Sequence, residues 1–342
     1  MRDCFNLSRR EFVKATAGAI VLGGASIGTA SAETKRAVKK GKPKVGCLSW
    51  CFHSFGAGAD PTEAIDIMGR IGFEGTELIL NARDDITNFW TDDKIGKLKK
   101  QLQRNELSVA QFVIFQPVVE GLSSLDADTR ERNLDYFEAG CKIGKKLGAP
   151  MVNIVAPWAR ELGKEKGYLP RFYELAEPKE GEKYKFSIAE GLDWEAVWQK
   201  YIRTSKACLE RAKAHDMKMS IEHHTHCIIP DATSFLRLWD AIKDDALGYN
   251  MDVGWTLLQR EYPPVAIHKV ASHLMNLHMR DIDGTMRRFV HVGQGVMDFE
   301  GIAKALKAIN FDGFLNIEQD KYPGDMIETC KRYLAIMKEH LA

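Results

Sequence analysis

Four side chains able to bind a metal lie at the ends of the last four apolar runs of the sequence. Glu222 ends KMSIE, Asp252 ends LGYNMD, His278 lies in LMNLHM and Glu318 follows GFLNI. Three carboxylates and one imidazole form a hard oxygen and nitrogen donor set, which suits one divalent ion such as Mn, Mg, Co or Zn. Because carboxylates dominate the set, Mn or Mg is favoured, and we expect Mn.

These four residues need a fold that brings strand ends together. The intervals between them are 30, 26 and 40 residues, and a strand–helix–strand unit takes roughly 30 residues or more. The pattern predicts a single (β/α)8 TIM barrel of the α/β class, in which the C-terminal ends of the strands converge on one pocket. Apolar runs predict the earlier strands at 45–49, 75–80, 108–114 and 151–155. Helical periodicity predicts helices at 126–147 and 192–214.

A second polar residue precedes each candidate ligand by two positions. These residues are Ser220, Asn250, Asn276 and Asn316, and the residues between are apolar. Because strand side chains alternate with a period of two, each polar pair shares one face and the apolar residues face the helices. Barrel interiors are usually filled with branched apolar side chains. We therefore expect the candidate ligands to form one layer, with the Ser and Asn residues beneath them supplying supporting hydrogen bonds.

The phrases around these residues resemble the sugar epimerase branch of the xylose isomerase-like TIM-barrel superfamily. They are IEHH, MDVGW, LHMRD and HVGQGVMDFEGIAKAL leading to FDGFLNIEQD. The resemblance covers roughly residues 44–340 and is strongest from residue 218 onward. In that branch a Glu, Asp, His, Glu quartet from the fifth to eighth strands binds the metal. The resemblance therefore implies that Glu222, Asp252, His278 and Glu318 hold it here.

The resemblance also implies a reaction. In the epimerase branch, the two ligand glutamates transfer protons at the carbon next to a carbonyl, from opposite faces of the substrate, through an enediolate. Carried over, Glu222 and Glu318 become the acid/base pair of a metal-dependent sugar isomerase or epimerase. The expected substrate is a small-molecule carbohydrate. Because barrels of this group are often dimers or tetramers, a homo-oligomer is an open alternative to a monomer.

Two residues close to the predicted ligands are candidates for substrate contact. Arg280 lies two positions after His278 on the same face, and its guanidinium suits a substrate oxygen or carboxylate. His224 shares a face with Glu222 and is expected either to bind substrate or to support the ligands.

Two more candidates rest on the resemblance. Glu77, on the strand 75–80, stands where the family often has a glutamate near the substrate; the alternative is an acid satisfied by backbone at the barrel mouth. The family often has Asp-x-x-His after the sixth strand, but here the fourth residue is Trp255. A metal or substrate contact is therefore missing or replaced at Trp255.

The first 32 residues are predicted to be a signal peptide rather than part of the barrel. Ser8–Lys14 is a twin-arginine pattern, a small-residue apolar run follows, and Ala30–Ala32 forms an A-x-A cleavage site. We expect export by the twin-arginine machinery to the periplasm or beyond, with a mature chain that starts near Glu33. A buried N-terminal helix or an uncleaved membrane anchor are the alternatives. Residues 33–43 form a basic linker, and residues 44–342 the barrel.

The balance of charged residues and one long insertion in the sequence limit which functional classes fit this chain. Lys and Arg number 48 against 47 Asp and Glu, so no basic surplus indicates a nucleic-acid partner. The near-zero net charge and the presence of Trp255 both disfavour a nuclease of the three-zinc type, a class of enzyme that has the same barrel fold. A metal-dependent lyase that acts on keto-glycosides through the same enolisation, and a non-catalytic carbohydrate-binding barrel, stay open. Residues 157–191, an insertion after the fourth strand that is rich in aromatic and charged residues, are expected to be a substrate lid, a solvated insertion or an oligomer contact.

Overall fold

The structure is a computed structural model of the 342-residue chain. It describes residues 41–115, 121–122, 124, 126–155, 190–225, 227–285, 288–319 and 324–342. The predicted signal peptide, most of the predicted linker and nearly all of the 157–191 insertion lie outside the described residues. None of the described helices is long and apolar enough to cross a membrane.

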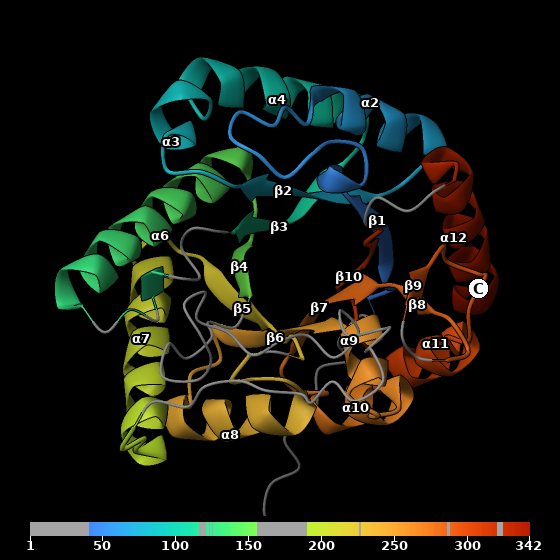
Figure 1. The fold of residues 1–342 in the computed structure, drawn as a ribbon. Coiled ribbons are helices and arrows are strands. Elements are labelled where there is room, and N and C mark those ends of the chain that lie inside the picture. Colours follow the sequence, from blue (N-terminus) through green and yellow to red (C-terminus); the bar gives the residue numbers. More distant parts are fainter. Residues whose placement is uncertain are drawn as a thin grey trace, which may run out of the picture. The chain divides into compact units, whose positions relative to one another are not determined.

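Eight parallel strands form a closed barrel (Figure 1). Around the barrel the order is β1, β10, β7, β6, β5, β4, β3 and β2, so strands adjacent in the chain are neighbours except for the small hairpin β8–β9. The barrel strands are β1 (Lys44–Leu48), β2 (Gly75–Leu80), β3 (Ser108–Ile114), β4 (Met151–Val155), β5 (Lys218–Glu222), β6 (Leu247–Asp252), β7 (Leu274–Met279) and β10 (Phe314–Ile317). The predicted TIM barrel is confirmed.

Helices surround the barrel and cover the outer faces of the strands (Figure 1). The longer ones are α2 (Thr62–Ile71), α4 (Asp92–Arg104), α6 (Ala127–Leu147), α7 (Trp194–Ala214), α8 (Ala232–Ile242), α10 (Pro263–Lys269), α11 (Phe299–Ala308) and α12 (Met326–Leu341). In α4 the buried residues Ile95, Leu98 and Leu102 recur at helical spacing, which gives one apolar face. Aspartates at the N-caps of α6, α7 and α8 accept backbone N–H bonds and fix where these helices begin.

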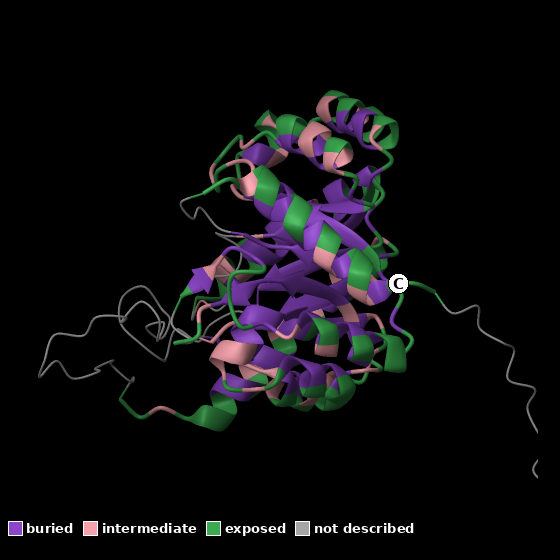
Figure 2. Ribbon diagram, turned by 90° about the vertical axis from the view of Figure 1, so that its right-hand side faces the viewer, coloured by how far each residue is buried: buried purple, intermediate pink, exposed green. Residues whose placement is uncertain are grey.

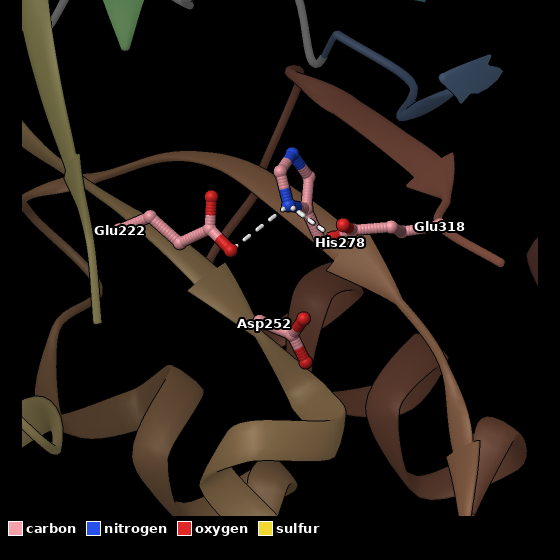
Figure 3. A group of neighbouring side chains, drawn as sticks. All are labelled: Glu222, Asp252, His278 and Glu318. Carbon is pink, nitrogen blue, oxygen red and sulfur yellow. Dashed lines mark ion pairs between the residues drawn. The ribbon is translucent and has the colours of Figure 1, made fainter. Parts of the chain in front are cut away.

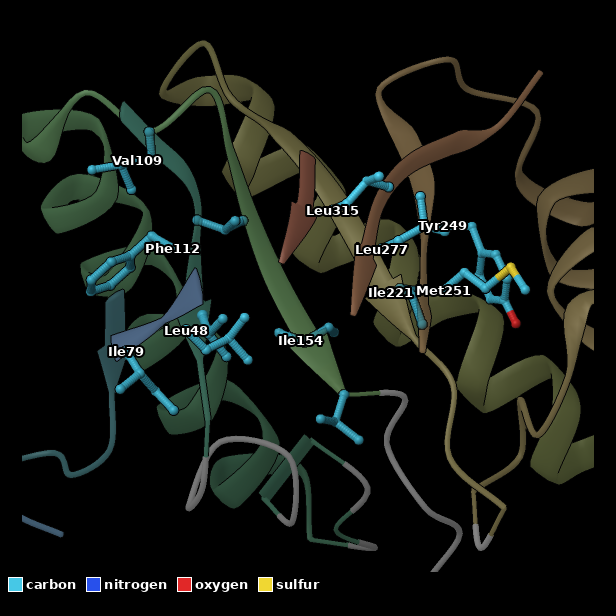
Figure 4. Close-up of a cluster of buried hydrophobic side chains, with 14 of the residues drawn as sticks. Leu48, Ile79, Val109, Phe112, Ile154, Ile221, Tyr249, Met251, Leu277 and Leu315 are labelled. Atoms are coloured by element: carbon cyan, nitrogen blue, oxygen red, sulfur yellow. The ribbon is translucent and has the colours of Figure 1, made fainter. Parts of the chain in front are cut away.

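The hydrophobic core lies between the barrel and the helices. Figure 2 shows buried strands inside and helices whose exposed residues face outward. The apolar residues that alternate with the candidate ligands are fully buried in this layer; among them Ile221, Met251, Leu277 and Leu315 are labelled in Figure 4. The alternation of polar and apolar residues in the sequence therefore predicted both faces of β5, β6, β7 and β10.

Smaller elements at the C-terminal ends of the strands were not predicted. They are η1 (Ser49–Cys51), α3 (Asp85–Asn88), α9 (Val253–Leu258) and the hairpin of β8 (Asp281–Ile282) and β9 (Phe289–Val290). Asp252 is the N-cap of α9, and the hairpin brings Phe289 against Trp255. These short elements lie at the end of the barrel where the predicted ligands also lie.

Candidate metal centre

The four predicted ligands converge at the C-terminal ends of their strands (Figure 3). Glu222 and Asp252 are the last residues of β5 and β6, His278 lies in β7, and Glu318 directly follows β10. Each offers one donor atom, and these atoms all lie within 4.8 Å of one another. All four side chains are buried. The barrel therefore gathers residues up to 96 positions apart in the sequence into one donor set.

His278 is the centre of the cluster. Its Nδ1 lies 2.9 Å from Glu318 Oε2 and 3.3 Å from Glu222 Oε1, so the two glutamates flank this nitrogen (Figure 3). The other ring nitrogen, Nε2, faces Glu77. Glu222 also contacts His224, whose Nε2 is 3.1 Å from Glu222 Oε1. Nδ1 is thus the nitrogen that faces the other candidate ligands.

Asp252 has two functions in the structure. Its Oδ1 accepts the backbone N–H groups of Gly254 at 2.7 Å and Trp255 at 2.9 Å, which caps α9. Its Oδ2 accepts Arg280 Nε at 2.8 Å, and the Arg280 guanidinium also forms an ion pair with Glu318. Asp252 is therefore both the N-cap of α9 and a member of the candidate donor group.

The charges in this cluster do not balance. Burial raises the pKa of Asp252 to about 7; Arg280 opposes the rise, and the carboxylates of Glu318 and Glu222 add to it. Burial alone would lower the pKa of His278, but the carboxylates of Glu222, Glu77 and Glu318 raise it well above its ordinary value. Four buried carboxylates face one arginine and one imidazole, so negative charge is in excess.

The donor set fits a divalent cation. Three carboxylates and an imidazole are oxygen and nitrogen ligands of the kind that Mn, Mg, Co and Zn accept. A divalent ion among them would offset the repulsion that raises the pKa of Asp252. Its ligands would be Glu222, Asp252, His278 and Glu318.

Amide side chains lie beneath the ligand layer, as the alternation of residues along the strands predicted. Asn250 Nδ2 donates to Glu222 Oε2 at 3.2 Å and contacts the His278 ring. Asn276 and Asn316 donate to Glu77 Oε1 at 2.8 and 2.7 Å. The predicted supporting bonds to the ligands are confirmed for Asn250, whereas Asn276 and Asn316 act through Glu77.

The sequence reasoning did not single out Gln111 in this layer. Gln111 Nε2 donates to Glu77 Oε2 at 2.9 Å, and its Oε1 accepts the hydroxyl of Ser220 at 2.8 Å. Ser220 therefore supports Gln111 rather than a ligand. Gln111 pairs with the inward-facing Glu77 in the register of β2 and β3. A polar residue at an inward position of a predicted strand was the available signal.

The structure places the predicted substrate contacts against the ligands themselves. Arg280 is engaged by Asp252 and Glu318. His224 contacts Glu222 and packs on the Trp255 ring, with ring centroids 4.7 Å apart. Trp255 is almost fully buried between His224 and Phe289. These residues form one wall of the centre.

Glu77 is fully buried inside the barrel, and the side chains of Gln111, Asn276, Asn316 and His278 surround its carboxylate. The alternative of an acid satisfied by backbone at the barrel mouth is therefore wrong, because side chains from β3, β7 and β10 hold this carboxylate. A substrate contact at Glu77 stays a prediction.

Asp281, which directly follows Arg280 in the chain, organises the loop after β7. It accepts backbone N–H bonds from Ile282, Gly293, Gly295 and Met297, at 2.9 to 3.0 Å. Since three of these donors, Gly293, Gly295 and Met297, lie in the segment that leads to α11, Asp281 ties this segment to the end of β7. Asp281 faces away from the ligands, as the alternation along the strand predicts.

Together, the strands form a closed parallel TIM barrel, and its strand ends carry a group of side chains that could hold a metal ion. The xylose isomerase-like TIM barrel family model matches residues 65–337, and the chain belongs to that family. The chain matches none of the curated protein sequences with which it was compared.

Several solved structures share the fold. A D-psicose 3-epimerase from Clostridium cellulolyticum H10 has a TM-score of 0.68 and 15% sequence identity, over 87% of this chain and 99% of that one. An L-ribulose 3-epimerase has a TM-score of 0.68 and 18% identity, over 87% and 94%. A 3-keto-D-glucoside 4-epimerase from E. coli has a TM-score of 0.66 and 14% identity, over 87% and 100%.

Proposed function

We propose that this protein is an exported, metal-dependent sugar isomerase or epimerase. The observation that carries the proposal is the placement of Glu222 and Glu318 on two sides of His278 Nδ1, within a buried cluster of four metal-type donors. The similar structures of two sugar 3-epimerases and a keto-glucoside 4-epimerase support the substrate class.

The residues divide the chemistry between them. A divalent metal, with Mn our first choice, would supply Lewis acidity to a hydroxyl and a carbonyl oxygen on adjacent carbons. Asp252 and His278, together with the two glutamates, would hold the metal. Glu222 removes the proton next to the carbonyl, and Glu318 returns a proton from the other side, or the reverse. Arg280 holds Asp252 and Glu318 in place through its ion pairs and lies close enough to steady a substrate oxygen.

Glu222 is ionised and can accept a proton. Burial would raise the pKa of Glu222, but His278 and His224 lower it well below the ordinary value. Because a low pKa also makes a carboxylate a weak base, the proposed proton removal depends on the position of Glu222 beside the substrate carbon. The cluster is also shielded, because His224, Trp255 and Arg280 cover one side. Limited access of water protects a reactive enediolate from side reactions.

The first experiment is metal analysis of the purified chain, with and without chelator. We expect about one equivalent of a divalent ion in the wild type and its loss in His278→Ala. If the protein takes up no metal and added metal does not raise its thermal stability, the proposed function is wrong and a carbohydrate-binding barrel without catalysis becomes the better account.

The second experiment tests the acid/base pair. Glu222→Gln and Glu318→Gln should each lower turnover by about 100-fold or more, since a positioned acid or base contributes about that much. Glu328→Gln, an isosteric change on the exposed side of α12, is the matched control and should be fully active. Exchange of the substrate proton with heavy water, followed by NMR for a panel of sugars, provides the assay. Full activity in either site variant would refute the assignment.

A lyase acting on keto-glycosides is the second candidate. It is favoured by the likeness to a structure that acts on a 3-keto-D-glucoside, and it needs the same proton removal followed by loss of a leaving group. Product analysis separates the two reactions, because elimination gives an unsaturated product and a free alcohol, whereas epimerisation conserves mass.

Export by the twin-arginine route is part of the proposal. The support is the SRREFVK pattern with its following apolar run and A-x-A site. N-terminal sequencing of the protein from the envelope fraction should give a start near Glu33. Recovery of an intact Met1 start from the cytoplasm would contradict export.

A further inference from the structure

Glu77 reaches the candidate metal centre from the opposite side of the barrel. It lies on β2, and no part of it is exposed to solvent. Its carboxylate lies 3.0 and 3.2 Å from Nε2 of His278, a residue 201 positions later in the chain. A carboxylate buried at this depth costs folding free energy unless its contacts satisfy it, so its placement needs a reason.

The groups around Glu77 are all donors. Gln111 Nε2 donates to Oε2, and Asn276 Nδ2 and Asn316 Nδ2 donate to Oε1. Other bonds fix the amide orientations, because Gln111 Oε1 accepts from Ser220 and Asn276 Oδ1 accepts from Asn316. Three amide donors therefore hold the carboxylate as an acceptor, with both of its oxygens close to His278 Nε2.

The two nitrogens of His278 face different surroundings. Nδ1 faces Glu318 and Glu222, whereas Nε2 faces Glu77. The other polar atoms close to Nε2 are the amide nitrogens of Gln111 and Asn250, which are donors. Among the described residues, Glu77 thus supplies the acceptor for a proton on Nε2. A neutral imidazole that carries its proton on Nε2 has its lone pair on Nδ1.

We propose that Glu77 is the positioning residue of the metal centre. By accepting the Nε2 proton it holds the His278 ring in one orientation and one tautomer, with the Nδ1 lone pair aimed between Glu222 and Glu318. This inference rests on the proposed metal centre, and it assigns Nδ1 as the coordinating atom. Carboxylates that accept the second ring proton of a ligand histidine raise its basicity and fix its geometry.

The substitution Glu77→Gln tests this assignment with little change in volume. One oxygen of the carboxylate becomes an NH₂ group that faces donors, so the acceptor for Nε2 or for the amides is lost. We expect metal affinity to fall about 10- to 100-fold, the range found for such supporting partners. The measurement is a titration of the purified full-length chain with Mn²⁺, followed by the EPR signal of the free ion, with folding checked by circular dichroism.

Two further variants make the titration decisive. Asn153→Ala removes a fully buried polar group from the same interior, where Asn153 Nδ2 donates to Ser220 Oγ at 3.0 Å and contacts neither Glu77 nor His278. Asn153→Ala should keep its Mn²⁺ affinity within about 3-fold of the wild-type value, whereas the affinity of Glu77→Gln should fall by more than that. His278→Ala should abolish binding. If His278→Ala loses Mn²⁺ binding but Glu77→Gln keeps the wild-type affinity, the positioning proposal is overturned and the metal centre stays intact. No binding in the wild type would overturn the metal centre itself.

A measurement on the wild type needs no variant. In protein loaded with diamagnetic Zn²⁺ and labelled with ¹⁵N, the His278 ring should show a protonated Nε2 and a metal-bound Nδ1. The opposite tautomer would refute the proposal. In folded Glu77→Gln we expect the Nε2 proton signal to broaden or disappear through faster exchange, whereas Asn153→Ala should retain it. Retention of a sharp Nε2 signal in Glu77→Gln would likewise overturn the positioning role.

Discussion

Lowering the pH from 7 to 5 should remove a stabilising contribution that one buried histidine makes. His223 is fully buried next to Glu222 and faces away from the barrel interior. Its ring stacks on Tyr249 with centroids 5.2 Å apart, and its Nε2 lies 3.2 Å from the Thr256 hydroxyl. Because that hydroxyl donates to the Asp252 carbonyl, His223 is the donor in this contact. Burial lowers the pKa of His223 to about 3.

The magnitude follows from linkage between protonation and folding. An unfolded histidine has a pKa of about 6.5, so below that pH the unfolded chain binds a proton that the native state refuses until about pH 3. The contribution of His223 to stability is therefore complete above pH 6.5 and is lost as the pH drops, by about 1.4 kcal/mol per pH unit. Between pH 7 and pH 5 the loss amounts to about 2 kcal/mol.

Urea unfolding of the wild type and of a His223 variant at pH 7, 6 and 5 measures this loss as a difference, because Asp252, whose pKa is raised to about 7, titrates in both proteins. Chelator is present so that metal binding does not contribute. The variant His223→Phe keeps a ring against Tyr249 but cannot titrate, so its stability should fall by about 2 kcal/mol less than that of wild type. His268→Gln, an exposed position on α10, is the control and should follow the wild type. Equal losses in wild type and His223→Phe would refute the reasoning.

Three further predictions concern Gly254, Asp281 and the metal. Gly254→Ala should cost about 1–3 kcal/mol in urea unfolding, because the new Cβ would lie 2.5 Å from the Phe289 ring; a neutral effect would show that the ring moves aside freely. Asp281→Ala should cost more than about 3 kcal/mol, since four backbone N–H groups lose a charged acceptor, and a loss below 1 kcal/mol would contradict that role. Divalent metal at 100 times its dissociation constant should raise the free energy of unfolding by about 2.7 kcal/mol, as measured by urea unfolding; no rise in wild type, or an equal rise in His278→Ala, would contradict the site.

The sequence predicted the barrel and the ligand layer because both depend on short-range regularities. Strand alternation and the length of each strand–helix unit are visible in the chain, and they placed Glu222, Asp252 and His278 in β5, β6 and β7, and Glu318 directly after β10. The strand ranges 75–80, 108–114 and 151–155 agree with β2, β3 and β4. Periodicity therefore determined which residues face inward.

The sequence did not predict which inward residues meet across the barrel. Contacts between Glu77 and His278, or between Gln111 and Ser220, depend on the heights at which distant strands are registered, and no local pattern encodes those heights. The substrate contact expected of Arg280 stays a prediction, and the sequence did not predict that its guanidinium pairs with Asp252 and Glu318. That pairing depends on how many carboxylates share the pocket, which appears only once the strands are assembled.

The amide layer beneath the centre also has a consequence for how the chain folds. Glu77 joins Asn276 and Asn316 across 199 and 239 positions of sequence, so these bonds form only after the first and last strands have met. Contacts with such long separation are slow to form, because a large loop must close before they contribute. A folding intermediate made of the second half of the chain would hold all four candidate ligands but lack Glu77. High-affinity metal uptake would then act as a reporter of barrel closure, the last step of folding.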